Sequence, residues 1–161
     1  MPIDQDAFKN ALRGWASGVT VVTARSSDKL HGMTVSAFTS VSADPPLVLI
    51  CANRASTTNS IIEEGGLFAV NILAAHQQEV SNLFASSKHE DSRLERVGWS
   101  EGVLGAPLID EALASLECKL ASSHLEGSHT IYVGQVEAVR TSDGEPLVYH
   151  QGAYRSLDRD E

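Results

Sequence analysis

The sequence has little of several residue types, and each shortage argues against a class of protein. Two cysteines, Cys51 and Cys118, lie far apart in apolar segments, a pattern typical of free thiols in a reducing cytosol rather than of a disulfide framework. Lysine and arginine number 12 against 21 acidic residues, and no basic cluster indicates nucleic-acid binding. No apolar run approaches the roughly 18 residues of a membrane helix. We therefore expect a cytoplasmic protein with neither a nucleic-acid nor a membrane partner.

Common catalytic and metal-binding signatures are also missing. The histidines and cysteines form no His-Glu-x-x-His or Cys-x-x-Cys pattern, so we expect no metal. There is no Gly-x-Ser-x-Gly elbow of a hydrolase and no Gly-x-Gly-x-x-Gly turn of a Rossmann domain. The length of 161 residues, 42% of them hydrophobic, predicts a single globular domain over residues 1–161.

Short strand patterns dominate the chain. Apolar and β-branched runs predict strands at 19–24, 47–52, 68–73, 113–121, 130–140 and 147–149, with an extended segment at 32–42. Apolar residues at helical spacing predict helices at 5–13, 58–64 and 74–85, and residues 86–93 are expected to be a loop. This pattern favours a mainly β fold, an antiparallel barrel with a few helices at its rim.

The most informative stretch, residues 32–57, contains a row of small hydroxyl side chains followed by a turn and a buried strand. Alternation along an extended strand directs one set of side chains to a common face, namely Thr34, Ser36, Phe38, Ser40 and Ser42. By the same alternation Val35, Ala37 and Val41 point the other way. Residues 53–57 then bring an arginine and hydroxyls to a helix N-terminus, an arrangement that favours a phosphate group.

These residues resemble the flavin reductase-like family, and the resemblance extends from about Phe8 to Leu157. It includes SGVTVVTA at 17–24, FAVNIL at 68–73, LFAS at 83–86, LECKL at 116–120, GSH at 127–129, IYVGQV at 131–136 and PLVYHQGAY at 146–154. The resemblance implies a Greek-key split barrel of the FMN-binding type that pairs as a homodimer. It also implies transfer of hydride from NADH or NADPH to N5 of FMN or FAD, with reduced flavin passing to a partner monooxygenase.

The resemblance also implies a set of cofactor-binding positions. Those expected to line the isoalloxazine are Met33, Thr34, Val35, Ser36 and Ala37. Those expected near the ribityl chain and phosphate are Ser40, Val41, Ser42, Ala52, Asn53, Arg54, Ser56 and Thr57. Tyr154 matches a region near the flavin. The alternatives are an exposed strand face for the hydroxyl row, a solvated loop arginine for Arg54 and a core aromatic for Tyr154.

By the same resemblance, the turn at 127–129 lies beside the nicotinamide. His129 is the predicted catalytic residue there, with Gly127 among the cofactor-binding residues. Family members typically have Gly-Asp-His, whereas this chain has Gly127-Ser128-His129. Serine forms hydrogen bonds without charge, so the preference between NADH and NADPH stays open.

Two other functions remain compatible with the sequence. One is a flavin-binding electron-transfer or storage protein that does not turn over nicotinamide. The other is a reductase of a bound acceptor, such as a corrinoid cobalt centre. The choice between FMN and FAD, and whether flavin is a prosthetic group or a diffusing substrate, is also open.

Overall fold

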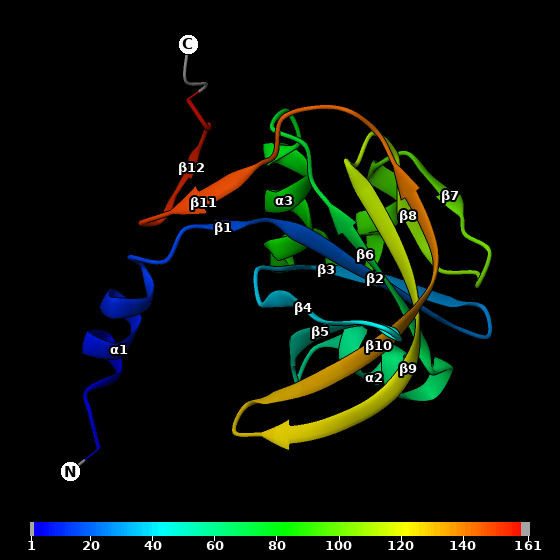
Figure 1. The fold of residues 1–161 in the computed structure, drawn as a ribbon, viewed down its shortest axis with the longest axis horizontal. Helices are drawn as coiled ribbons and strands as arrows, with labels where there is room; N and C mark the ends of the chain where they lie inside the picture. Colours follow the sequence, from blue (N-terminus) through cyan, green and yellow to red (C-terminus); the bar gives the residue numbers. More distant parts are fainter. Residues whose placement is uncertain (1, 159–161) are drawn as a thin grey trace.

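The computed structural model describes residues 2–158 of the chain and is mainly β, as predicted (Figure 1). The helices are α1 (Gln5–Leu12), α2 (Thr57–Gly65) and α3 (Gln78–Ala85), followed by a 3-10 segment, η1 (Ser87–Arg96). The strands are β1 (Ser17–Gly18), β2 (Thr20–Ser26), β3 (Lys29–Val35), β4 (Phe38–Ala43), β5 (Pro46–Asn53), β6 (Leu67–Ile72), β7 (Trp99–Glu101), β8 (Pro107–Ile109), β9 (Ala114–Glu126), β10 (His129–Thr141), β11 (Val148–His150) and β12 (Ala153–Arg155). No helix among the described residues has the length and apolar character needed to cross a bilayer.

Seven strands form one antiparallel sheet in the order β3-β2-β6-β9-β10-β5-β4. Strands β3 and β4 are consecutive in the chain yet stand at opposite ends of this order, joined only by Ser36 and Ala37. A link of two residues spans no more than about 10 Å, so the sheet must be strongly curved. A small sheet, β1-β11-β12, and the β7-β8 hairpin complete the described strands.

The prediction of one extended segment over 32–42 is wrong. Strand β3 ends at Val35, β4 starts at Phe38, and a register shift interrupts β4 between Ser40 and Ser42. The predicted alternation is lost: Val35 is 5% exposed, whereas Val41, expected on the same side, is 48% exposed. Side chains alternate between the two faces of a sheet only within one regular strand. Here the chain passes from one end of the sheet order to the other between β3 and β4, and a bulge interrupts β4, so the positions that face the core change at both places.

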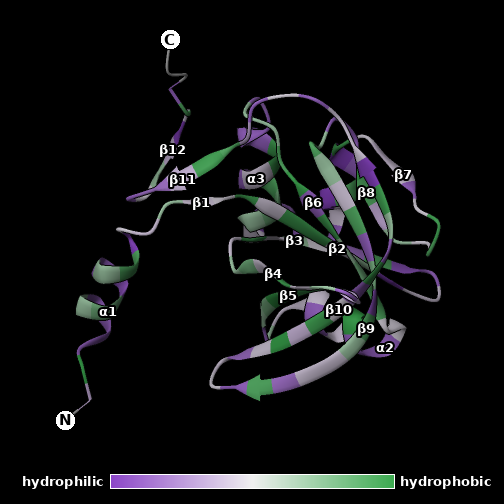
Figure 2. Ribbon diagram, viewed as in Figure 1, coloured by the Kyte–Doolittle hydropathy of each residue, from purple (hydrophilic) through white to green (hydrophobic). Residues whose placement is uncertain are grey.

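The core lies inside the curved sheet. One apolar cluster includes Val22, Ile50, Phe68 and Tyr132, and α2 covers it with buried Ile61 and Ile62 among its members. A second cluster lies under α3 and includes Phe84, Leu73 and Leu147. Figure 2 shows hydrophobic and hydrophilic residues alternating along β9 and β10, as expected for strands with one buried face.

Most of the segment at 86–93, predicted to be a loop, is ordered as 3-10 helix. Residues 87–93 belong to η1, which has non-helical backbone at His89 and Ser92. The buried Arg93 donates hydrogen bonds to the carbonyl oxygens of Gly32 (2.8 Å) and Ser86 (2.8 Å). The sequence did not indicate this order, because the segment is polar and Arg93 bonds to backbone carbonyls, which leave no pattern in the side chains. The helix predicted at 74–85 starts later, at Gln78, since Gln77 is buried and accepts a hydrogen bond from the Ala74 N–H instead.

The cysteines are free thiols, as predicted. Cys51 is half-buried on β5 and Cys118 is buried on β9. Burial, with a smaller contribution from the neighbouring Glu117, raises the pKa of Cys118 to about 12. That thiol is therefore protonated and unreactive at neutral pH.

Candidate functional site

Two adjoining cavities lie on the outer face of the sheet near α1. The main cavity, of about 790 Å³, lies between α1, residues 36–39, β5 and the β11–β12 hairpin. The side cavity, of about 380 Å³, lies between α3, β3 and the same hairpin. Both are lined by Ser36, Tyr149 and Gly152, so they adjoin at these residues. The larger volume is in the range of ordinary ligand pockets, about 300–1,000 Å³.

The break between β3 and β4 contributes Ser36 to both cavities and Ala37 to the main cavity. Ser36 and Ala37 are exposed there, and Ala37 accepts a hydrogen bond from the Cys51 N–H (3.0 Å) that ties the break to β5. Phe38, Leu49 and Cys51 add apolar surface to the main cavity. A flat aromatic ligand would therefore meet apolar side chains together with exposed backbone and a serine hydroxyl.

The side cavity holds Tyr154 in a polar network. Its hydroxyl donates to Asn82 Oδ1 (2.7 Å) and lies 2.7 Å from Ser81 Oγ. Its ring packs edge-on against the ring of Tyr149, with 5.4 Å between the ring centroids. Thr34 Oγ1 donates to the Ser81 carbonyl (2.6 Å). The structure thus brings Tyr154 to the predicted isoalloxazine segment. It also adds Ser81 and Asn82, which the sequence analysis missed because only the apolar positions of α3 gave a signal.

A second group of predicted residues meets where β5 ends and β10 begins. His129 is the cross-strand partner of Asn53, and Ser128 Oγ lies 2.8 Å from His129 Nδ1. Arg54 donates from its guanidinium to the Gly127 carbonyl (3.2 Å) and from its N–H to the Ser128 carbonyl (3.0 Å). The turn at 127–129 and the loop after β5 are therefore one local structure.

The hydroxyls at the start of α2 already have local partners. Ser56 Oγ caps the helix by accepting from the Asn59 N–H (3.1 Å) and donates to the Asn53 carbonyl (2.8 Å). The Asn53 side chain accepts from the Ala55 N–H (2.9 Å). Thr57 is exposed beside Glu90, with their side-chain oxygens 3.5 Å apart. A phosphate at this loop would have to compete with these bonds or use the remaining N–H groups.

The structure separates other predicted residues from this group. Ser40 and Ser42 pair with Val48 and Leu47, at the opposite end of β5 from Asn53. Six residues of strand between Leu47 and Asn53 correspond to roughly 20 Å. The two predicted phosphate contacts therefore lie too far apart to hold one phosphate group.

Three of the predicted positions direct their side chains into the core. Val35 and Ala52 are buried in the first apolar cluster, and the half-buried Met33 packs against it. Any contact of Val35 or Ala52 with a ligand on the outer face would be made by the backbone.

His129 lies on the same face of the sheet as the main cavity. Side chains of cross-strand partners project from the same face, and Asn53, the partner of His129, is two residues beyond the cavity-lining Cys51. One strand spacing combined with two residues of rise separates His129 from Cys51 by roughly 8 Å between Cα atoms. A ligand that extends past Cys51 would reach the imidazole.

Comparisons with known proteins identify the family of this chain. A family model described as flavin reductase like domain matches residues 12–158. An NADH-dependent flavin reductase from a Rhodococcus species is 45% identical over 154 residues, covering 94% of this chain and 85% of that protein. The FMN reductase (NADH) SmoA of Agrobacterium fabrum is 39% identical over 153 residues, covering 95% of this chain and 86% of that protein.

A solved structure shows the same fold. BorF, the flavin reductase component of a bacterial two-component tryptophan halogenase, matches with a TM-score of 0.88 and 40% identity, covering 97% of this chain and 100% of that chain. The chain therefore belongs to the flavin reductase-like family, as its sequence predicted. Its fold is shared with a solved flavin reductase.

Proposed function

We propose that the protein oxidises NADH or NADPH and transfers the hydride to N5 of FMN or FAD, releasing reduced flavin to a partner monooxygenase. One observation carries the proposal: the family-matching segment 33–37 ends at the exposed Ser36, which lines both ligand-sized cavities, and Ala37, which lines the main one. The 45% identity with an NADH-dependent flavin reductase supports the same reaction.

The residues present fit a flavin. Phe38, Leu49 and Cys51 supply the apolar surface for the ring system, and Ser36 with the adjoining backbone supplies polar contacts at its edge. The flavin itself supplies the hydride-accepting chemistry. The protein's part is to hold the nicotinamide against the bound ring and to exclude water, and such positioning can lower a barrier by roughly 7–11 kcal/mol in ideal cases.

His129 is proposed to contact the nicotinamide. The imidazole lies on the cavity face of the sheet, and Ser128 Oγ, 2.8 Å from Nδ1, holds the ring in place. The hydroxyl supplies no charge where relatives of the family typically have an aspartate. We therefore expect the imidazole to act mainly by contact and orientation.

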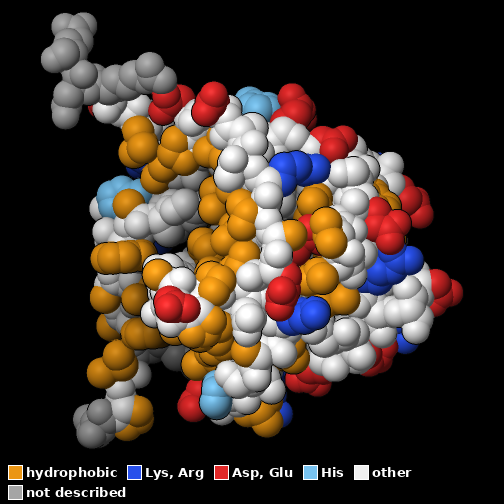
Figure 3. Space-filling model, turned by 45° about the vertical axis from the view of Figure 1, so that its right-hand side comes forward, with side chains coloured by type: hydrophobic (Ala, Val, Ile, Leu, Met, Phe, Trp, Pro, Cys, Tyr) orange, Lys and Arg blue, Asp and Glu red, His pale blue; other side chains and the backbone are white. Residues whose placement is uncertain are grey.

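We further propose that residues 1–161 form one domain, that its sheet closes as a Greek-key split barrel, and that two copies pair as a homodimer. The short link between β3 and β4 supports closure. Helix α1 has no buried residue, with Phe8 51% and Leu12 55% exposed, and Figure 3 shows hydrophobic side chains at the left margin, where α1 lies. A second copy would cover this surface, and light scattering after gel filtration would measure the mass. Two free thiols support a cytoplasmic location.

The test of the reaction is the oxidation of NADH, and separately of NADPH, by purified protein with and without added FMN, FAD and riboflavin. Turnover that requires added flavin and saturates with it would establish a reductase of diffusing flavin. Tightly bound flavin without turnover would refute the proposal in favour of an electron-transfer protein. Turnover only with an added corrinoid would instead identify a reductase of that acceptor.

A further inference from the structure

The tip of the β9–β10 hairpin stands apart from the core. Residues 121–129 are all exposed, and Figure 1 shows this end of the hairpin at the lower left margin of the molecule. The last cross-strand pair that joins β10 to β5 is His129 with Asn53. No buried side chain therefore holds the turn that follows β9, and its order depends on hydrogen bonds.

This turn has two carbonyl groups for partners outside the hairpin. Glu126 and His129 pair across the hairpin, so Gly127 and Ser128 form a two-residue turn, in which Gly127 has a φ of 59°. Glycine at the first central position is typical of a type II′ hairpin turn. A backbone carbonyl that is left out of the ladder must bind water or another segment of the chain.

Arg54 binds both carbonyl groups. Its N–H donates to the Ser128 carbonyl (3.0 Å), and its Nη1 donates to the Gly127 carbonyl (3.2 Å). Within the part of the chain that the structure describes, these are the hydrogen bonds that reach the two turn residues from outside the hairpin. Because one bond comes from the backbone and the other from the end of the side chain, together they fix both the position and the tilt of the turn.

The loop that carries Arg54 is itself fixed. The carbonyl of the preceding residue, Asn53, accepts from the N–H (3.0 Å) and the Oγ (2.8 Å) of Ser56. Ser56 Oγ also caps α2 by accepting from the Asn59 N–H (3.1 Å). Arg54 therefore ties the hairpin tip to the N-terminus of a helix that packs on the core.

His129 is held through the same turn. Ser128 Oγ lies 2.8 Å from His129 Nδ1, and the Ser128 carbonyl is the group that the Arg54 N–H binds. An imidazole on an unsupported hairpin tip would lose conformational freedom when a ligand binds, which lowers affinity. A turn that is anchored beforehand avoids this loss.

We propose that Arg54 is a positioning residue, which acts through the turn at 127–129 to hold the His129 imidazole where the nicotinamide arrives. The inference rests on the proposed function, since that function gives His129 its contact with the nicotinamide. It assigns Arg54 a role different from the phosphate contact expected from the sequence.

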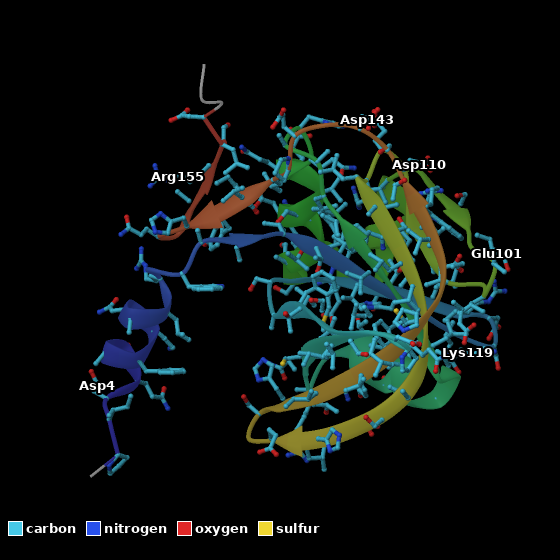
Figure 4. All side chains as sticks on the ribbon, viewed as in Figure 1. Asp4, Glu101, Asp110, Lys119, Asp143 and Arg155 are labelled. Atoms are coloured by element: carbon cyan, nitrogen blue, oxygen red, sulfur yellow. The ribbon has the colours of Figure 1, made fainter. Side chains whose placement is uncertain are left out.

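The first experiment measures amide hydrogen exchange in Arg54→Met, which keeps a long side chain but has neither donor nor charge. We expect peptides that cover residues 122–130 to exchange several-fold faster in this variant than in wild type. Lys119→Met is the matched control, because Lys119 is an exposed cation on the same strand, β9, and lies away from the turn in Figure 4. Equal exchange in Arg54→Met and wild type would overturn the proposed anchor.

The second experiment separates positioning from a phosphate contact. Arg54→Met should raise the KM for NADH about threefold to tenfold, the effect of one lost hydrogen bond, at nearly constant kcat. Its affinities for FMN and for riboflavin should both stay unchanged. Arg54→Lys, which keeps a donor, should recover part of the loss. An unchanged KM would overturn the proposal, and weaker binding of FMN but not of riboflavin would overturn it in favour of a phosphate contact.

The third experiment tests whether Arg54 acts through the imidazole. In a double-mutant cycle, Arg54→Met should raise the KM for NADH no further once His129→Ala is present. Additive effects would overturn the positioning role and indicate a direct contact between Arg54 and the donor. If wild type did not oxidise NADH, the reductase function would be refuted, and the hydrogen-exchange comparison would still decide whether Arg54 anchors the turn.

Discussion

Replacement of Asn71 by alanine should destabilise the protein more than most single substitutions. The side chain is fully buried on β6 and joins four strands through four hydrogen bonds. Its amide nitrogen donates to the Val21 carbonyl (3.0 Å) and to Thr23 Oγ1 (3.3 Å). Its oxygen accepts from the Ile109 N–H (3.0 Å) and from Ser115 Oγ (2.8 Å).

The cost follows from the groups that the substitution leaves behind. The buried Ile109 N–H loses its partner, at about 1–3 kcal/mol. The buried Ser115 hydroxyl loses its acceptor, and the missing amide leaves a small cavity, for about 1 kcal/mol each. We expect Asn71→Ala to lower the free energy of unfolding by about 3–5 kcal/mol, a large part of a typical total of about 5–15 kcal/mol.

Urea unfolding, followed by circular dichroism with linear extrapolation to water, measures this loss. Asn10→Ala on α1 is the control, because Asn10 is exposed and should change stability by no more than about 0.5 kcal/mol. A double-mutant cycle with Ser115→Ala should give a coupling of about 1 kcal/mol. A loss of less than about 1 kcal/mol for Asn71→Ala would refute the role of this network.

Three further predictions address the site and its surroundings. His129→Ala should raise the KM for the nicotinamide donor and leave flavin affinity nearly unchanged. Unchanged kinetics would refute the proposed contact between His129 and the nicotinamide. Alanine at both Ser40 and Ser42 should weaken FMN binding by about 1 kcal/mol for each hydrogen bond lost, and equal affinity would move the phosphate to the other end of β5. Burial and the nearby Arg93 lower the pKa of His31. The unfolded chain therefore takes up this proton first, and stability should fall as the pH drops below about 6.5. His31→Gln should flatten that dependence in urea titrations at pH 7 and pH 5, and an equal slope would contradict the assignment.

Several elements were predictable because their signals are local. The continuous apolar run at 47–52 became β5, with Val48, Ile50 and Ala52 buried. The helix expected at 58–64 became α2, capped by Ser56 and closed by Gly66 at a φ of 68°. Apolar periodicity, caps and glycine act over a few residues, so the sequence displays them directly.

The predictions that failed depended on distant partners. Whether residues 32–42 form one strand or two depends on which sheet edges receive them, and nothing within that segment specifies this. The segment at 86–93 is polar, and its order comes from Arg93 reaching back to the carbonyl of Gly32. A hydrogen bond to a carbonyl 61 residues away leaves no local pattern.

The sequence by itself determined the family and the mainly β class, because these follow from ordered motifs and short-range periodicity. The tertiary structure decided which residues share a cavity. Only folding places Arg13 against Gln151, or His129 beside Asn53, since the curved sheet and the C-terminal hairpin bring these residues together across 138 and 76 positions of chain. Such long-range contacts form only when the whole core packs, because the entropy cost of bringing distant segments together is offset by contacts among many elements and not within one segment.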